Sequence, residues 1–166
     1  MCKCESMCSG ERSIVPAEDV SAWCSRTGQD FARFATSLDP ETHYKTIVVD
    51  YLISNPDRHG QNWGFYMDNR SGDLVSLHPL FDHNNAFHPE DMRLANGGQS
   101  LMVEGKSKRD AAKFALKRCE LKILKPLKRE DFLDERHRKS FLERCKTLGI
   151  QVRKLGRCVP ESDPNP

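Results

Sequence analysis

The sequence predicts an α+β fold that is mainly helical and carries one small β-hairpin. Three observations support this prediction: a stretch of helical apolar spacing before residue 54, two short runs of strand character within residues 62–81, and two helical stretches after residue 105. The expected order is helix, helix, polar loop, hairpin, loop, helix, helix. With 166 residues, of which 37% are hydrophobic, the chain can form one domain around one core.

The first helix is expected to begin at Pro16 and to continue past Trp23 to about Phe34, after an extended or disordered segment of residues 1–15. The segment "SLDPET" then has the features of a second helix start. Asp39 can cap the helix, and Pro40 suits the first helical position because its missing N–H is not needed there.

The second helix is the clearest element of the sequence, because its apolar residues recur at the spacing of one buried helix face. We expect it to end at Ser54, since Asn55 precedes Pro56 and is pushed out of the helical region. The apolar stripe consists of Tyr44, Ile47, Val48, Tyr51 and Leu52.

Beyond a polar loop, "NWGFYM" and "LVSLHPLF" read as two strands joined by the turn "DNRSGD", with Pro79 marking the end of the second strand. Residues 82–98 read as a loop. A helix begins with Ser107 and Asp110 as a capping box, and a final helix is expected from about Glu130 to Leu148, with Gly149 as its stop.

The polar loop "SNPDRHGQNWGF" places Asp57 and Asn62 five positions apart, directly after the buried helix. The far strand of the hairpin delivers Asp82, so the three side chains can converge at one edge of the hairpin. Carboxylate and carboxamide oxygens bind hard divalent cations, and a separate carboxylate can orient or deprotonate an attacking hydroxyl. This set, with its D-x-x-x-x-N spacing, suits phosphoryl transfer. Ordinary turn chemistry is the alternative for a loop rich in Asn, Pro, Asp and Gly.

The segments "DYLISNPDRHGQNWGF" and "LHPLFDHNNAF" together resemble the carboxyl-terminal catalytic region of the HipA-like protein kinases, and "MCKCES...SIVPAEDV" resembles the stretch joining the two lobes in some bacterial members. The resemblance implies a protein-kinase-like large lobe over residues 16–158. Residues 159–166, which include "PESDPNP", read as a disordered tail. It implies a Ser/Thr protein kinase that uses ATP and Mg²⁺ and acts on a protein substrate.

By this resemblance, Asp57 is the catalytic aspartate, and Asn62 and Asp82 bind magnesium. Arg58, like Asn62 and Asp82, is expected to bind the cofactor. Arg58 and His59 also shape the loop. His59 is counted as catalytic as well, because D-R-H-x-x-N is shared with phosphoinositide-type lipid kinases, where the histidine can touch phosphate or assist proton transfer.

A small lobe with a glycine-rich loop and a strand lysine is not recognisable, since the lysines before the loop are Lys3, in the tail, and Lys45, on a helix. We therefore expect that the chain forms a large lobe and that the small lobe is absent. Its kinase activity alone is expected to be weak or missing. A partner chain that supplies the small lobe is a related possibility.

The charge is uneven, with 18 Lys+Arg against 7 Asp+Glu in residues 105–158. This leaves open a non-catalytic module whose basic half binds nucleic acid or an acidic partner. A metal-dependent nuclease built on His78, His83 and His88 is a further alternative.

The longest apolar run is interrupted by Asp50, and the N-terminus lacks a signal-peptide core, so we expect a cytoplasmic protein without a membrane span. The seven cysteines are expected to be reduced. Cys2, Cys4 and Cys8 form a C-x-C-x-x-x-C cluster without an obvious fourth metal ligand.

Overall fold

The computed structural model describes residues 10–80, 83, 85–87, 103, 105–121 and 127–152. The chain forms two compact units, residues 1–121 and 122–166, which we describe separately. Helices and a small antiparallel sheet make up the described elements, so the α+β, mainly helical class is confirmed. In the described part of the chain, no helix has both the length and the apolar composition needed to span a membrane.

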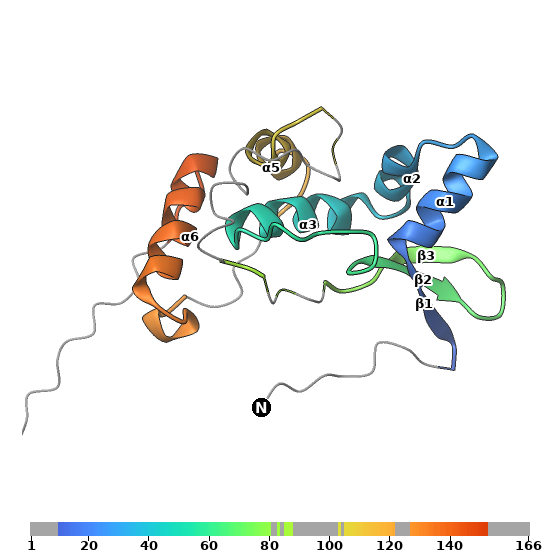
Figure 1. Cartoon of the computed structure of the whole chain (residues 1–166), viewed down its shortest axis with the longest axis horizontal. Helices are drawn as coiled ribbons and strands as arrows, with labels where there is room; N and C mark the ends of the chain where they lie inside the picture. Colours follow the sequence, from blue (N-terminus) through green and yellow to red (C-terminus); the bar gives the residue numbers. More distant parts are fainter. Residues whose placement is uncertain are drawn as a thin grey trace, which may run out of the picture. The chain divides into compact units, whose positions relative to one another are not determined.

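The sheet of the first unit has three antiparallel strands in the order β1-β2-β3 (Figure 1). These are β1 (Arg12–Pro16), β2 (Gly64–Asp68) and β3 (Leu74–Leu77). The expected hairpin of β2 and β3 is confirmed, while β1 is an additional strand that the sequence did not reveal. Val15 pairs with Phe65 and Pro16 pairs with Gly64, so the end of β1 lies beside the start of β2.

The single helix expected from Pro16 to Phe34 is wrong, because this segment forms two helices, α1 (Ala17–Thr27) and α2 (Phe31–Leu38). Gly28 adopts a left-handed conformation with φ of 68° and ends α1. Asp30 then accepts a hydrogen bond from the Arg33 amide and caps α2. Both helices contact the sheet (Figure 1).

Helix α3 (Pro40–Leu52) has the predicted cap at Asp39, whose carboxylate accepts from the Thr42 amide. Four residues of the predicted stripe, from Ile47 to Leu52, are buried. Helix α5 (Lys108–Leu116) packs against α3 (Figure 1). Three alanines of α5 are buried, and their small side chains permit a close approach of helices. Ser107 caps α5, as the sequence predicted.

The second unit contains a short 3-10 helix (Arg129–Asp131) and helix α6 (Glu135–Leu148). The expected start of the final helix at Glu130 is wrong, because Asp134 has an extended backbone and its carboxylate accepts from the Arg136 and His137 amides. The predicted stop is confirmed, since Gly149 ends α6 with φ of 74°.

Candidate functional site

The polar loop begins where α3 ends in a tight left-handed turn. Ser54 has φ of 56°, an unusual value for a residue other than glycine, and is fully buried. The Asn55 amide donates to the Asp50 carbonyl at 2.8 Å, and the Asn55 side-chain oxygen accepts from the Asp57 amide at 3.1 Å. The path of the chain into the loop is therefore fixed by side chains as well as by the backbone.

The centre of the loop is a buried ion pair between Asp50 of α3 and Arg58. Arg58 donates from Nε to Asp50 Oδ2 at 2.9 Å and from Nη2 to Oδ1 at 2.8 Å, a two-point geometry. Its Nη1 donates to the Asn62 carbonyl at 2.7 Å, and Asn55 Nδ2 adds a bond to Asp50 Oδ1 at 3.1 Å. Because removal of one partner from a buried pair costs on the order of 3–5 kcal/mol, this network should hold the loop firmly.

Asp57 lies next to this network, but its carboxylate faces outward. Its side chain is 45% exposed, and Oδ2 accepts a hydrogen bond from Asn85 Nδ2 at 2.9 Å. His59 Nε2 lies 3.8 Å from Asp57 Oδ1 and is also half-exposed. The carboxylate is thus anchored on one side and remains accessible to a reacting group.

Asn62 is buried, and its Nδ2 donates to the Asp57 carbonyl, while its Oδ1 lies 3.5 Å from Arg58 Nη1. The bond from Nδ2 orients the carboxamide, and Oδ1 accepts the long bond from Arg58 Nη1. A carboxamide oxygen is a ligand type that magnesium accepts, but Asn62 Oδ1 is buried and faces the guanidinium of Arg58. The donor atom of Asn62 is of a suitable type, and a magnesium ion could reach it only if the Arg58 guanidinium moved away from Oδ1.

The first turn of α1 holds the loop from a second side. The Glu18 amide donates to the Gly60 carbonyl at 3.1 Å, the Ala17 amide donates to the Trp63 carbonyl at 3.0 Å, and Gln61 Nε2 donates to Glu18 Oε1 at 2.9 Å. A Cβ atom on Gly60 would lie 2.9 Å from Glu18 Cβ. This close approach requires glycine at the position and explains its place in the loop.

Lys108, the first residue of α5, reaches the loop from a third side. Its Nζ donates to the carbonyls of Asn55 and Pro56, each at 3.2 Å, and these are the two residues that precede Asp57. A cation beside the carbonyl groups that follow a helix end is also favoured by the helix dipole. Helix α5 therefore contributes directly to the geometry of the loop.

His78 and His83, two of the histidines considered for a metal site, have different hydrogen-bond partners. His78 is buried at the end of β3, and its Nδ1 donates to the Pro79 carbonyl at 2.6 Å. Burial lowers the pKa of His78, the bond to Pro79 opposes this change, and the positive charge of Arg58 lowers the pKa further. His83 Nδ1 lies 3.3 Å from Arg58 Nη2. In the described ranges, no three His, Cys, Asp or Glu side chains gather as a metal site.

Among the predicted site residues, the structure places Asp57, Arg58, His59 and Asn62 in one loop, and their catalytic or binding roles stay predictions. Asp82 lies outside the described residues, as do His88, Cys2, Cys4 and Cys8. The predicted convergence of Asp82 with the loop is therefore untested.

Sequence reasoning missed four residues that position the loop: Asp50, Asn55, Asn85 and Lys108. A signal for Asp50 was present, because a charged residue interrupted an otherwise apolar helix face. Nothing in the spacing indicated Lys108, which lies more than 50 residues from the carbonyl groups that it contacts.

A family model described as "HipA-like C-terminal domain" matches residues 20–151. This range includes the whole polar loop, the hairpin and the helices α3, α5 and α6. No curated protein and no solved structure matches the chain.

Proposed function

Because the chain belongs to the HipA-like C-terminal domain family, we propose that its polar loop is the phosphoryl-transfer site of a Ser/Thr protein kinase that uses ATP and Mg²⁺. The observation that carries the proposal is the two-point pair of Asp50 and Arg58. This pair fixes a loop in which Asp57 is exposed and anchored, with Asn62 at the spacing that kinases use. We also propose a cytoplasmic location, where ATP is supplied.

In this mechanism, Asp57 accepts a hydrogen bond from the hydroxyl of the protein substrate and orients it for attack. Asn85 Nδ2 holds Asp57 Oδ2, which leaves Oδ1 directed to the substrate. His59 Nε2 lies 3.8 Å from Oδ1, and we propose that it contacts the transferred phosphate. The roles of Asp57 and His59 require no movement of the buried Arg58, whose guanidinium serves the loop itself.

Asn62 and Asp82 would hold the magnesium ion, with Asn62 contributing Oδ1 in place of the long bond that this atom accepts from Arg58 Nη1. A bound magnesium ion supplies neutralisation of the charge on the nucleotide phosphates. We propose that the chain acts as the large-lobe part of the kinase and has weak activity alone, because positioning by a small lobe contributes much of the rate in this chemistry.

The test combines calorimetric titration of ATP, with and without magnesium, and transfer of labelled γ-phosphate to a protein substrate. Asp57→Asn should keep magnesium-dependent ATP binding and lose at least about 100-fold in turnover, in keeping with a general base. Asp82→Ala should lose the binding. Glu130→Gln, an exposed change in the second unit, is the matched control and should alter neither. Turnover that survives Asp57→Ala would contradict the proposal.

A second candidate function is a non-catalytic binding module, or a partner-dependent half of a split kinase, with a basic carboxyl-terminal surface. The excess of 18 Lys+Arg over 7 Asp+Glu in residues 105–158 favours it. DNA binding with a steep salt dependence, in the absence of magnesium-dependent ATP binding, would support this module over the kinase.

A further inference from the structure

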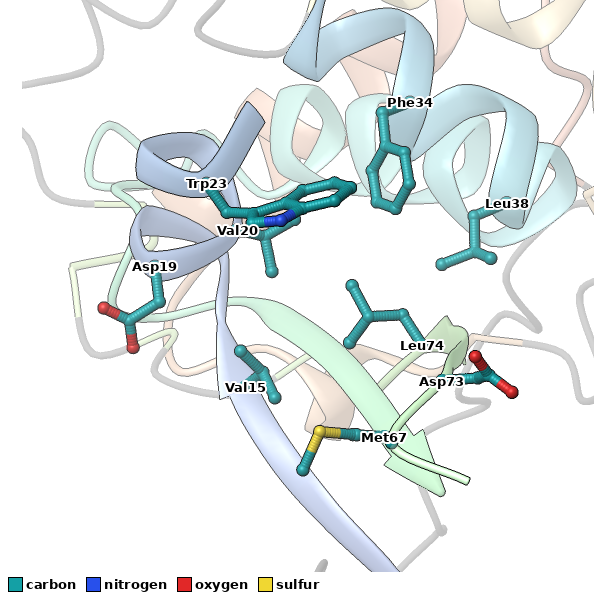
Figure 2. Close-up of a pocket in the computed structure, with 10 residues that line it drawn as sticks. Val15, Asp19, Val20, Trp23, Phe34, Leu38, Met67, Asp73 and Leu74 are labelled. Carbon is teal, nitrogen blue, oxygen red and sulfur yellow. The ribbon is translucent and has the colours of Figure 1, made fainter. Parts of the chain in front are cut away.

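A cavity of about 510 Å³ lies between the sheet and the helices α1 and α2 (Figure 2). Trp23 and Phe34 project from the helices, and Met67 and Leu74 face them from the strands. We call this cavity the apolar cleft. Its volume falls in the range of small-ligand and side-chain pockets, and its lining residues include none of the polar loop.

The apolar cleft retains exposed aromatic surface. Trp23 is 40% exposed although its ring meets Phe34 edge-on, with centroids 5.6 Å apart. The opposite wall is aliphatic, so the contact leaves one side of the indole open to the cleft (Figure 2). Partly exposed tryptophans beside apolar pockets are typical anchors of protein interfaces.

The two ends of the apolar cleft carry negative charge. Asp19 from α1 lies at one end, and Asp73, in the turn before β3, lies at the other (Figure 2). Both residues are exposed, and among the described residues neither carboxylate pairs with a basic side chain. The lining of the cleft includes no Lys or Arg. A ligand with an apolar centre and positive charge on both sides is therefore complementary to it.

We propose that the apolar cleft docks a short peptide segment of a partner protein that carries leucine or another large apolar residue between Lys or Arg residues. The apolar side chains fill the space between Trp23, Phe34 and Leu74. The flanking cations meet Asp19 and Asp73. Such docking is separate from phosphoryl transfer, because the cleft and the polar loop share no lining residue.

The test measures the fluorescence anisotropy of a fluorescein-labelled peptide, Arg-Lys-Leu-Leu-Lys-Arg, added to the full chain. We expect a dissociation constant of about 0.1 mM or tighter. Two matched peptides, with Glu in place of the bases or with Ser in place of the leucines, should each bind at least about tenfold more weakly. A Glu peptide that binds as well as the basic one would overturn the charge complementarity.

The double variant Asp19→Asn/Asp73→Asn should weaken the binding of the basic peptide by about tenfold or more. Because both side chains are exposed, the helical circular dichroism should stay unchanged. Glu143→Gln, an exposed acid of α6, is the matched control and should bind the peptide normally. Equal weakening by the control would indicate a general charge effect and would overturn the proposal.

Acrylamide quenching of the full chain tests whether the cleft is free. Trp63 is buried, so Trp23 should account for most of the quenching, and the basic peptide should protect it. Protection of Trp23 before any peptide is added would show that a segment of the chain itself covers the cleft, which would overturn docking of a partner.

Discussion

Asp50 in the last turns of α3 and Arg58 in the polar loop form a two-point ion pair, with Nε–Oδ2 at 2.9 Å and Nη2–Oδ1 at 2.8 Å. Both side chains are buried, and the remaining Nη1 of Arg58 donates to the Asn62 carbonyl. One arginine thereby connects a helix to both ends of the D-x-x-x-x-N segment. The loop geometry depends on this pair more than on any exposed contact.

Asp50→Asn should destabilise the chain strongly, because it leaves the buried guanidinium of Arg58 without its charge partner. We expect a loss of about 3–5 kcal/mol in the free energy of unfolding, measured by urea denaturation. The control Glu11→Gln removes an exposed partner of Arg70 and should cause no measurable loss. A similar small effect of both substitutions would show that Asp50 and Arg58 do not form a buried pair in solution.

Replacement of three glycines by alanine should lower the free energy of unfolding by amounts that follow the space around each glycine. An added Cβ would lie 2.3 Å from the Val15 carbonyl oxygen at Gly64 and 2.9 Å from Glu18 Cβ at Gly60. At Gly10 it would meet no atom within 4 Å apart from the glycine and its chain neighbours. Gly64→Ala should therefore cost about 3 kcal/mol or more, because backbone must move. Gly60→Ala should cost about 1–3 kcal/mol.

Gly10→Ala is the matched control and should be neutral, since its surroundings are open. The midpoints of urea denaturation, compared at constant slope, rank the three variants. The ranking would be contradicted if Gly10→Ala were as destabilising as Gly64→Ala, because β1 would then not pack against β2 as described.

The sequence was informative where structure is local and less so where it depends on distant contacts. Apolar spacing predicted α3, and the caps at Asp39 and Ser107 were correctly read, because each depends on residues within one turn. The break at Gly28 was missed, although glycine followed by Asp30 is a stop and a new cap. Strand β1 could not be found, since its pairing with β2 joins residues about 50 positions apart.

The candidate site follows the same rule. The loop residues Asp57, Arg58 and Asn62 were identified from their spacing and from the family resemblance. The contacts that hold them, from Asp50 and Lys108, depend on how α3 and α5 pack. Side-chain pairing across a fold leaves little periodic signal in one sequence, so it becomes visible only when the elements are placed.

Asp134 should show the pH dependence of a capping carboxylate. Hydrogen bonds from the His137 amide and from Arg136 lower the pKa of Asp134 to about 2. Its contribution to stability is therefore complete above the unfolded pKa of about 4 and is lost as the pH falls through about 2. Carboxyl NMR should give a titration midpoint near 2 for Asp134.

Asp134→Asn keeps a good capping side chain but removes the charge. The stability difference between the unmodified chain and this variant should accordingly shrink between about pH 4 and pH 2, measured by urea unfolding followed through helical ellipticity. A midpoint for Asp134 near 4 would show that the cap of α6 does not form.

Lys108 should control the order of the loop segment that precedes Asp57. Its Nζ donates to the Asn55 and Pro56 carbonyls, so Lys108→Met removes both bonds while keeping a long apolar stem. We expect a loss of about 1–3 kcal/mol in the free energy of unfolding. Hydrogen exchange of the amides in residues 55–62 should become faster, because these amides depend on a fixed loop backbone.

Two further variants separate this role from a general effect of charge on α5. Lys108→Arg keeps a donor at a similar reach and should restore part of the stability and of the exchange protection. Lys113→Met removes an exposed lysine of the same helix and should change neither quantity. If Lys113→Met accelerated exchange in residues 55–62 as much as Lys108→Met did, the bonds from Lys108 to the loop carbonyls would not be the cause. If Lys108→Met left exchange unchanged while Asp50→Asn increased it, the loop would be held by the Asp50–Arg58 pair alone.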